Sequence, residues 1–150
     1  MNVELLVSAL VSEEGYRGLL YDDKTGKDLY KGCLIQGNPT IGLGWNVAGK
    51  ELSLERARII TGWFVQDTWA ELETALPWVT SLPEGVQIAI CDMAYNLGVP
   101  GLLKFTTFLT MMKAGNYSVA ADDLKTTLWA KQVGKRASVI ESLIRNAVHS

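Results

Sequence analysis

The sequence predicts an α+β fold in which a small antiparallel sheet lies between a short first helix and a larger helical region. Apolar residues recur at helical spacing in residues 2–13, whereas residues 19–47 are rich in Gly, Tyr, Ile and turn signals. Helical patterns return at residue 53 and continue towards the C-terminus. With 150 residues and 48% hydrophobic content, we expect a single domain over residues 1–150.

The first helix and the sheet follow from local signals. One helical face over residues 2–13 is apolar, formed by Val3, Leu6, Val7, Leu10 and Val11. Gly15 and Gly18 end this pattern, and turn signals such as Asp23-Lys24-Thr25-Gly26 follow. We therefore expect a β-containing lobe at about residues 14–50.

The helical lobe is expected at about residues 51–150, with the first helix joining it and a cleft between the lobes. Ser53 can cap a helix whose apolar face is Ile60, Trp63 and Phe64. Ser81-Leu82-Pro83-Glu84 matches a capping box. The segment Val86 to Leu97 is apolar nearly all round, which predicts a central buried helix.

Three more helices are expected near residues 105–114, 118–130 and 135–147. Gly115 and Gly134 are the expected stop signals between them.

Charge and targeting signals narrow the function classes. Residues 1–103 carry a net charge of −6 and residues 104–150 carry +4, which leaves open either attraction to an anionic polymer or ordinary surface variation. No apolar run of about 18 residues is present, so we expect no stable membrane insertion. The N-terminus lacks a basic region and a cleavage site, so we expect no signal peptide and synthesis into the cytoplasm of the cell that makes the protein.

Metal, disulfide and nucleotide sites are not expected. Cys33 and Cys91 are too few for a disulfide framework, and His149 is the one histidine. Gly42 and Gly44 lack the spacing of a phosphate-binding loop. We therefore expect no metal, no cofactor and no nucleic acid partner.

Two carboxylates and a hydroxyl are the candidate chemical groups. Glu14 and Asp23 bracket a short stretch, and Thr40 follows in Pro39-Thr40-Ile41-Gly42-Leu43-Gly44. Carboxylates on opposite sides of a sugar can hydrolyse a glycosidic bond. The structural alternatives are a solvated helix-end Glu14, a turn-capping Asp23 and an ordinary strand residue at Thr40.

These motifs resemble the phage-type lysozymes of glycoside hydrolase family 24. That family also has Glu-Gly near the end of a short helix, then Tyr and Asp, then Thr-Ile-Gly-x-Gly. The similarity continues in three downstream segments: Cys91-Asp92-Met93-Ala94-Tyr95-Asn96-Leu97-Gly98, Phe105-Thr106-Thr107, and Leu128-Trp129-Ala130-Lys131-Gln132 with Lys135-Arg136-Ala137. The resemblance therefore covers nearly the whole chain and implies a lysozyme-like fold.

The resemblance implies a role for each candidate residue. Glu14 would be the general acid, Asp23 would support an attacking water, and Thr40 would orient that water in an inverting reaction. Asp22 is adjacent, but alignment from Glu14-Gly15 favours Asp23. Thr40 lies 17 positions after Asp23, whereas the short family members use only a handful. Residues 27–38 must therefore loop out near the cleft rim.

Further residues are candidates for binding and support. Trp45 can either stack on a sugar or fill the core. Tyr95 and Asn96 match cleft-lining positions of the family, with core burial as the alternative for Tyr95. Arg136 matches the arginine that pairs with the catalytic Glu, and its alternative is a solvated helix surface.

The resemblance implies an endolysin-like muramidase, acting as a monomer on the β-1,4 bond of bacterial peptidoglycan. Without an export signal it would wait for a holin to open the membrane. A lytic transglycosylase and a catalytically inactive peptidoglycan-binding module are the alternatives. Asp23 and Thr40 argue against the first, and the intact Glu14, Asp23 and Thr40 set argues against the second.

Overall fold

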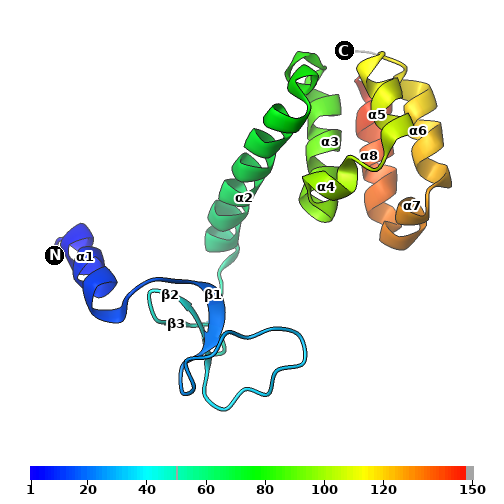
Figure 1. Ribbon diagram of the computed structural model, residues 1–150. Helices are drawn as coiled ribbons and strands as arrows, with labels where there is room; N and C mark the ends of the chain where they lie inside the picture. The colour runs from blue at the N-terminus through cyan, green and yellow to red at the C-terminus, as the bar shows by residue number, and fades with distance from the viewer. Residues whose placement is uncertain (50, 148–150) are drawn as a thin grey trace. The chain divides into compact units, whose positions relative to one another are not determined.

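The computed structural model describes residues 1–49 and 51–147, without the side chain of Glu14. His149 lies outside this range. The chain forms two compact units, Met1–Leu54 and Glu55–Ser150 (Figure 1). The first holds a small antiparallel sheet and the second is helical, which confirms the α+β class. That the first helix joins the helical lobe stays a prediction.

The first unit begins with α1 (Val3–Glu14), whose start Asn2 caps by accepting a hydrogen bond from the Leu5 amide at 3.1 Å. Gly15 ends it with a positive φ of 70°. A three-stranded sheet follows in the order β1 (Arg17–Asp22), β2 (Pro39–Gly42), β3 (Trp45–Asn46). The predicted first helix and sheet are therefore confirmed.

The strand register fixes which residues meet across the sheet. Tyr21 pairs with Thr40, and Asp22 pairs with Pro39. Thr40 also pairs with Asn46 on its other side, so it occupies the central strand. Its side chain and that of Asp22 are the buried ones among the described residues of this unit.

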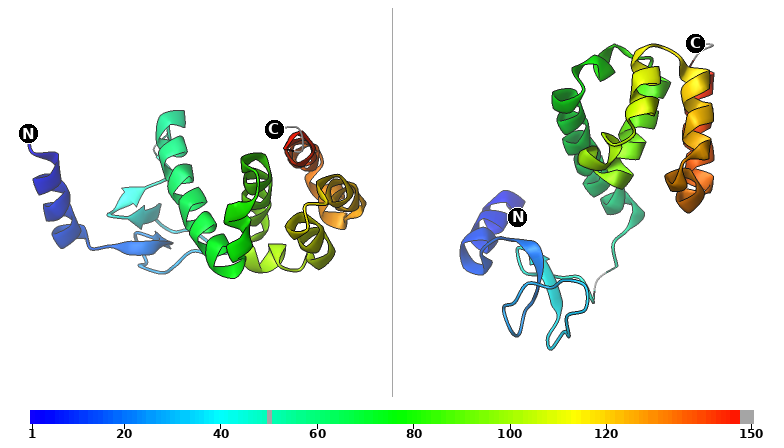
Figure 2. Two further views of the ribbon diagram at one scale, coloured as in Figure 1. Left: turned by 90° about the horizontal axis from the view of Figure 1, so that it is seen from above. Right: turned by 45° about the vertical axis from the view of Figure 1, so that its right-hand side comes forward.

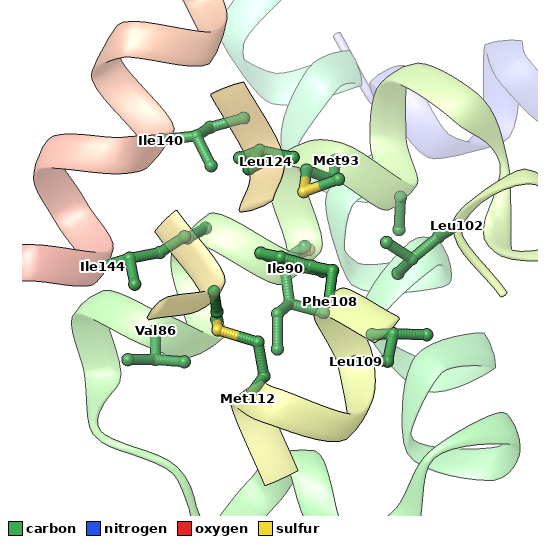
Figure 3. Close-up of a cluster of buried hydrophobic side chains, with 14 of the residues drawn as sticks. Val86, Ile90, Met93, Leu102, Phe108, Leu109, Met112, Leu124, Ile140 and Ile144 are labelled. Atoms are coloured by element: carbon green, nitrogen blue, oxygen red, sulfur yellow. The ribbon is translucent and has the colours of Figure 1, made fainter. Parts of the chain in front are cut away.

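The second unit holds seven α-helices and one 3-10 helix among its described residues. In chain order these are α2 (Leu54–Ala75), η1 (Pro77–Ser81), α3 (Glu84–Leu97), α4 (Val99–Leu102), α5 (Thr106–Lys113), α6 (Tyr117–Thr126), α7 (Leu128–Val133) and α8 (Lys135–Asn146). α3 packs against α8, and α6 packs against both α5 and α8 (Figures 1 and 2). The buried apolar core lies entirely in this unit, around residues such as Ile90, Phe108 and Ile140 (Figure 3).

Several local predictions were wrong. Ser81 does not cap α3: it belongs to η1, and its hydroxyl donates to the Trp78 carbonyl at 2.8 Å. Pro83 takes the capping position instead. The helix expected over residues 118–130 is two helices, because Thr127 adopts an extended ψ of 151° and its hydroxyl caps α7.

Two apolar surfaces are more exposed than the sequence predicted. Trp63 and Phe64 of α2 are exposed, and Leu72 is the buried residue of that helix. α3 is central, as predicted, but it is not buried all round, since Ile88 and Tyr95 are exposed. No helix in the described part of the chain is long and apolar enough to cross a membrane.

Shortening Ile90 tests whether α3 anchors the helical core. Ile90 is 0% exposed, so Ile90→Val should lower the free energy of unfolding by about 0.5–1.5 kcal/mol through the lost methylene and the space it leaves. Ile88→Val is the matched control, because Ile88 on the same helix is 49% exposed and should cost less than about 0.5 kcal/mol. Urea unfolding measures both, and equal costs would contradict this placement of the core.

Candidate active site

Asp22 and Asp23 are adjacent but have opposite environments. Asp22 is 1% exposed, and its carboxylate accepts the backbone amides of Lys24 and Thr25 in the following turn. The turn-capping role considered for Asp23 therefore belongs to Asp22. Backbone amides, led by that of Gln36, hold the pKa of Asp22 below its ordinary value despite burial, which opposes this shift.

Asp23 is exposed, and Asn38 holds its carboxylate. The Asn38 amide donates to Asp23 Oδ1 at 2.6 Å, and Asn38 Nδ2 lies 3.0 Å from Oδ2. These two hydrogen bonds, the backbone one first, lower the pKa of Asp23. Asp23 is therefore an oriented, ionised and accessible carboxylate at neutral pH.

Thr40 lies close to Asp23 through a shared partner. The Asn38 carbonyl accepts the Asp23 amide at 3.0 Å and the Thr40 hydroxyl at 3.2 Å. Thr40 is 3% exposed on the central strand, so its hydroxyl has a fixed position. The longer connection thus leaves Asp23 and Thr40 bound to the same residue, and their joint role in the site stays a prediction.

The segment of residues 27–38 is anchored at both ends. At its start the Asp22 amide donates to the Lys27 carbonyl and the Leu29 amide donates to the Leu20 carbonyl. At its end the Gln36 and Gly37 amides donate to the Asp22 carboxylate. Its middle forms a long loop beside the sheet, where Leu34 is 92% exposed (Figure 1). Its place at a cleft rim stays a prediction.

Arg17 fixes the opposite end of β1. Its guanidinium donates to the Gly26 carbonyl at 2.9 Å and forms an ion pair with Asp28. The same group lies 4.1 Å from the centre of the Tyr21 ring. The turn after Asp23 is therefore held by Asp22, which binds the Lys24 and Thr25 amides, and by Arg17, which binds the Gly26 carbonyl.

The remaining candidates of the first unit are Glu14 and Trp45. Glu14 is the last residue of α1, and its catalytic role stays a prediction because its side chain is outside the described part. Trp45 lies in β3 opposite Ile41 and is half-buried, a position compatible with both of its interpretations.

The second unit brings Tyr95 and Arg136 into one pocket of about 490 Å³. Its lining residues are Thr61, Val65, Trp69, Glu84, Gln87, Ile88, Cys91, Asp92, Tyr95 and Arg136. Tyr95 is exposed in this pocket, so core burial is excluded for it. Arg136 forms a short ion pair with Asp92, and its Nε donates to Asp92 Oδ1 at 2.7 Å. A pairing of Arg136 with Glu14 stays a prediction.

Asn96 joins α3 to α7. Its Oδ1 accepts the Trp129 indole N–H at 2.9 Å, and the Trp129 ring meets Phe105 edge to face at 6.1 Å between centroids. The Asn96 oxygen is therefore engaged within the protein, which leaves its amide NH₂ as the part that can meet a ligand.

Sequence reasoning missed three polar residues: Asp22, Asn38 and Asp92. Asp22 was visible only as the neighbour of Asp23. Asn38 was only the last residue of the segment of residues 27–38, and Asp92 had no assigned role within the downstream segment that resembles the family. Among the residues that the structure describes, no group of three or more His, Cys, Asp or Glu could hold a metal ion.

Removing the Asn38 side chain tests its hold on Asp23. Asn38→Ala removes the Nδ2 donor and keeps the backbone amide, so the pKa of Asp23 should rise towards the ordinary 3.8. Carbon-13 NMR titration of the carboxyl groups measures this. Asn46→Ala is the control, because the Asn46 side chain accepts from Ala48 rather than contacting Asp23. An unchanged or lower pKa in Asn38→Ala would contradict the assignment.

Comparison with known proteins identifies the family of this chain. The family model described as "Phage lysozyme" matches residues 12–147. A stretch of 58 residues, 39% of this chain, is 40% identical to the pre-baseplate central spike protein Gp5 of Enterobacteria phage T4 and covers 10% of that protein. The chain thus matches only about a tenth of the length of this curated relative. Because the family model covers most of the chain, the protein belongs to the phage lysozyme family, which supports a lysozyme-like, peptidoglycan-degrading function.

Proposed function

We propose that the protein is a muramidase that hydrolyses the β-1,4 bond between N-acetylmuramic acid and N-acetylglucosamine in bacterial peptidoglycan. The observation that carries the proposal is the arrangement of Asp23 and Thr40 around Asn38. The carboxylate of Asp23 and the hydroxyl of Thr40 both form hydrogen bonds with Asn38, which supports this arrangement. Family membership supports the substrate class.

Asp23 and Thr40 are suited to hold an attacking water. The Thr40 hydroxyl donates its proton to the Asn38 carbonyl, so its lone pairs are left to accept one proton of a water. The Asp23 carboxylate can accept the other proton, because its lowered pKa keeps it charged. The water oxygen then turns its lone pair towards the anomeric carbon. This arrangement leads to inversion, which needs carboxyl groups about 6.5–9.5 Å apart.

Glu14 is the proposed general acid that protonates the leaving oxygen. It is the last residue of α1, and the C-terminal end of a helix carries partial negative charge. No basic residue lies in the last turn of this helix. This position at the helix end motivates the test of Glu14 below.

Each unit, taken by itself, has residues for which we propose substrate contacts. Trp45 and Tyr95 offer aromatic faces to sugar rings, and Asn96 offers its amide NH₂ to a hydroxyl or acetamido group. Arg136 is proposed as a supporting residue of the site. In the structure Asp92 balances its charge.

In its biological role the protein would lyse the host cell as a monomer. It would need no metal or organic cofactor, and release to the cell wall would depend on a holin. A lytic transglycosylase is the nearest alternative. That reaction uses no attacking water, so Asp23 and Thr40 would have no role in it. Its products carry anhydro ends rather than reducing ends. A peptidoglycan-binding module without activity would release neither product.

Replacing the proposed acid tests the mechanism. Glu14→Gln keeps the shape but removes the proton, and one positioned acid contributes about 10²–10⁴-fold to rate. Turbidity clearing of cell walls should slow by that factor. Glu13→Gln is the matched control, because Glu13 is its exposed neighbour on the same helix and should keep full activity. If Glu14→Gln retains more than about a tenth of the activity, the assignment is wrong.

The stereochemistry of the first product tests the role of Asp23. If Asp23 holds a water on the face opposite the leaving group, the fresh reducing end should be the α-anomer. Proton NMR on newly cleaved glycan measures the anomer before mutarotation. A first product with the β configuration would mean that Asp23 acts as a nucleophile or that another mechanism operates.

A further inference from the structure

The Asp22 carboxylate is saturated by backbone amides from two separate parts of the chain. Its Oδ1 accepts from Lys24 at 2.9 Å and Thr25 at 3.2 Å, in the turn that follows it. Its Oδ2 accepts from Gln36 at 2.6 Å, and Gly37 donates to both oxygens at 3.1 and 3.2 Å. A carboxylate has about four acceptor positions, so none is left for a substrate or a catalytic water.

Gly37 makes this closure possible through its missing side chain. A Cβ at residue 37 would overlap Asp23 Oδ1 and lie 2.6 Å from Lys24 Cβ and 2.8 Å from Asp22 Oδ1. The requirement for glycine here comes from the close approach of two chain segments. The carboxylate and the glycine are thus two independent features that bring residue 37 against Asp22 and Asp23.

The next residue, Asn38, forms hydrogen bonds with both Asp23 and Thr40, the proposed water-holding residues. Its amide and side chain hold the Asp23 carboxylate, and its carbonyl accepts from the Asp23 amide and the Thr40 hydroxyl. The position of Asn38 follows from that of Gln36 and Gly37, which are bound to Asp22. A chain of direct contacts therefore runs from Asp22 to the atoms that would hold the water.

We propose that Asp22 is a positioning residue: its buried carboxylate closes the segment of residues 27–38 onto β1 and so sets Asn38 against Asp23 and Thr40. The inference rests on the proposed function for the roles of Asp23 and Thr40. Charge-assisted hydrogen bonds to backbone amides are strong, and here they bind Asp22 to residues 14 and 15 positions further along the chain. Without them Asn38 loses its fixed place beside the catalytic carboxylate.

Asp22→Asn separates this role from a simple charge effect. The asparagine oxygen can still accept from the Lys24 and Thr25 amides. Its NH₂ group is a donor, however, so it cannot accept from the Gln36 and Gly37 amides as the second carboxylate oxygen does. The Asp22 charge by itself raises the pKa of Asp23, so its removal alone would lower that pKa. Loss of the Asn38 hydrogen bonds, which are the main causes of the low pKa, would raise it. We expect a rise in carbon-13 NMR titration.

Gly37→Ala tests the same closure without a change of charge. The new Cβ should push the segment away from Asp22 and Asp23, and the pKa of Asp23 should again rise. Two controls match these variants. Gly49→Ala meets no atom within 4 Å, and Asp28→Asn removes a charge of the same segment that pairs with Arg17 instead. Neither control should raise the pKa of Asp23.

If Asp22 acts by positioning, its replacement should lower kcat and leave KM nearly unchanged. Misplacement of a water-holding group by about 1 Å costs about 10²-fold, so both variants should lose about that factor in kcat with little change in KM. A rise in the pKa with full activity would support the closure and overturn the proposed function of Asp23. A pKa that falls or stays unchanged in folded variants would overturn the positioning role, and so would complete loss of the sheet in both.

Discussion

The arrangement of the first unit depends on the buried carboxylate of Asp22. Asp22 and Thr40 are the buried side chains among its described residues, so hydrogen bonds replace an apolar core at this point. Each Asp22 oxygen accepts backbone amides, and such charge-assisted hydrogen bonds are strong. Since folding lowers the pKa of Asp22, its stabilising contribution is present above pH 3.8 and is lost as the pH falls through the folded value.

The second unit is stabilised in a different way. Its core is a continuous apolar cluster in which α3 meets α8, and residues such as Ile90 and Met93 are fully buried. This packing holds Tyr95, Asn96 and Arg136 on or beside one helix of defined position. A polar, loop-rich unit and an apolar helical unit are expected to differ in local stability. The proposed chemical groups thus lie in the unit with fewer buried apolar contacts.

Much of the fold was predictable because it follows from periodicity and glycine signals. α1, the sheet, α5 and α8 match their expected ranges, and Gly115 and Gly134 lie at helix ends with positive φ. Short elements such as η1 and α4 were missed because four or five residues show no period. The predicted capping box at Ser81 does not form. The Ser81 hydroxyl instead donates a hydrogen bond to the carbonyl of Trp78, which is three residues earlier in the chain. Asp23 and Thr40 were proposed from their motif, whereas the roles of Asp22 and Asn38 depend on contacts between residues 15 positions apart.

The length of the segment of residues 27–38 explains why such contacts are needed. A short connection between a carboxylate and a hydroxyl places both groups by its own geometry. A longer one has more conformations to lose, although the entropic cost grows only slowly with length. The anchors at Leu20 and Asp22 remove most of that freedom near the sheet and leave the exposed stretch around Leu34 outside the constraint. This division lets the tip of the segment vary in sequence while Asn38, Asp23 and Thr40 keep their mutual geometry.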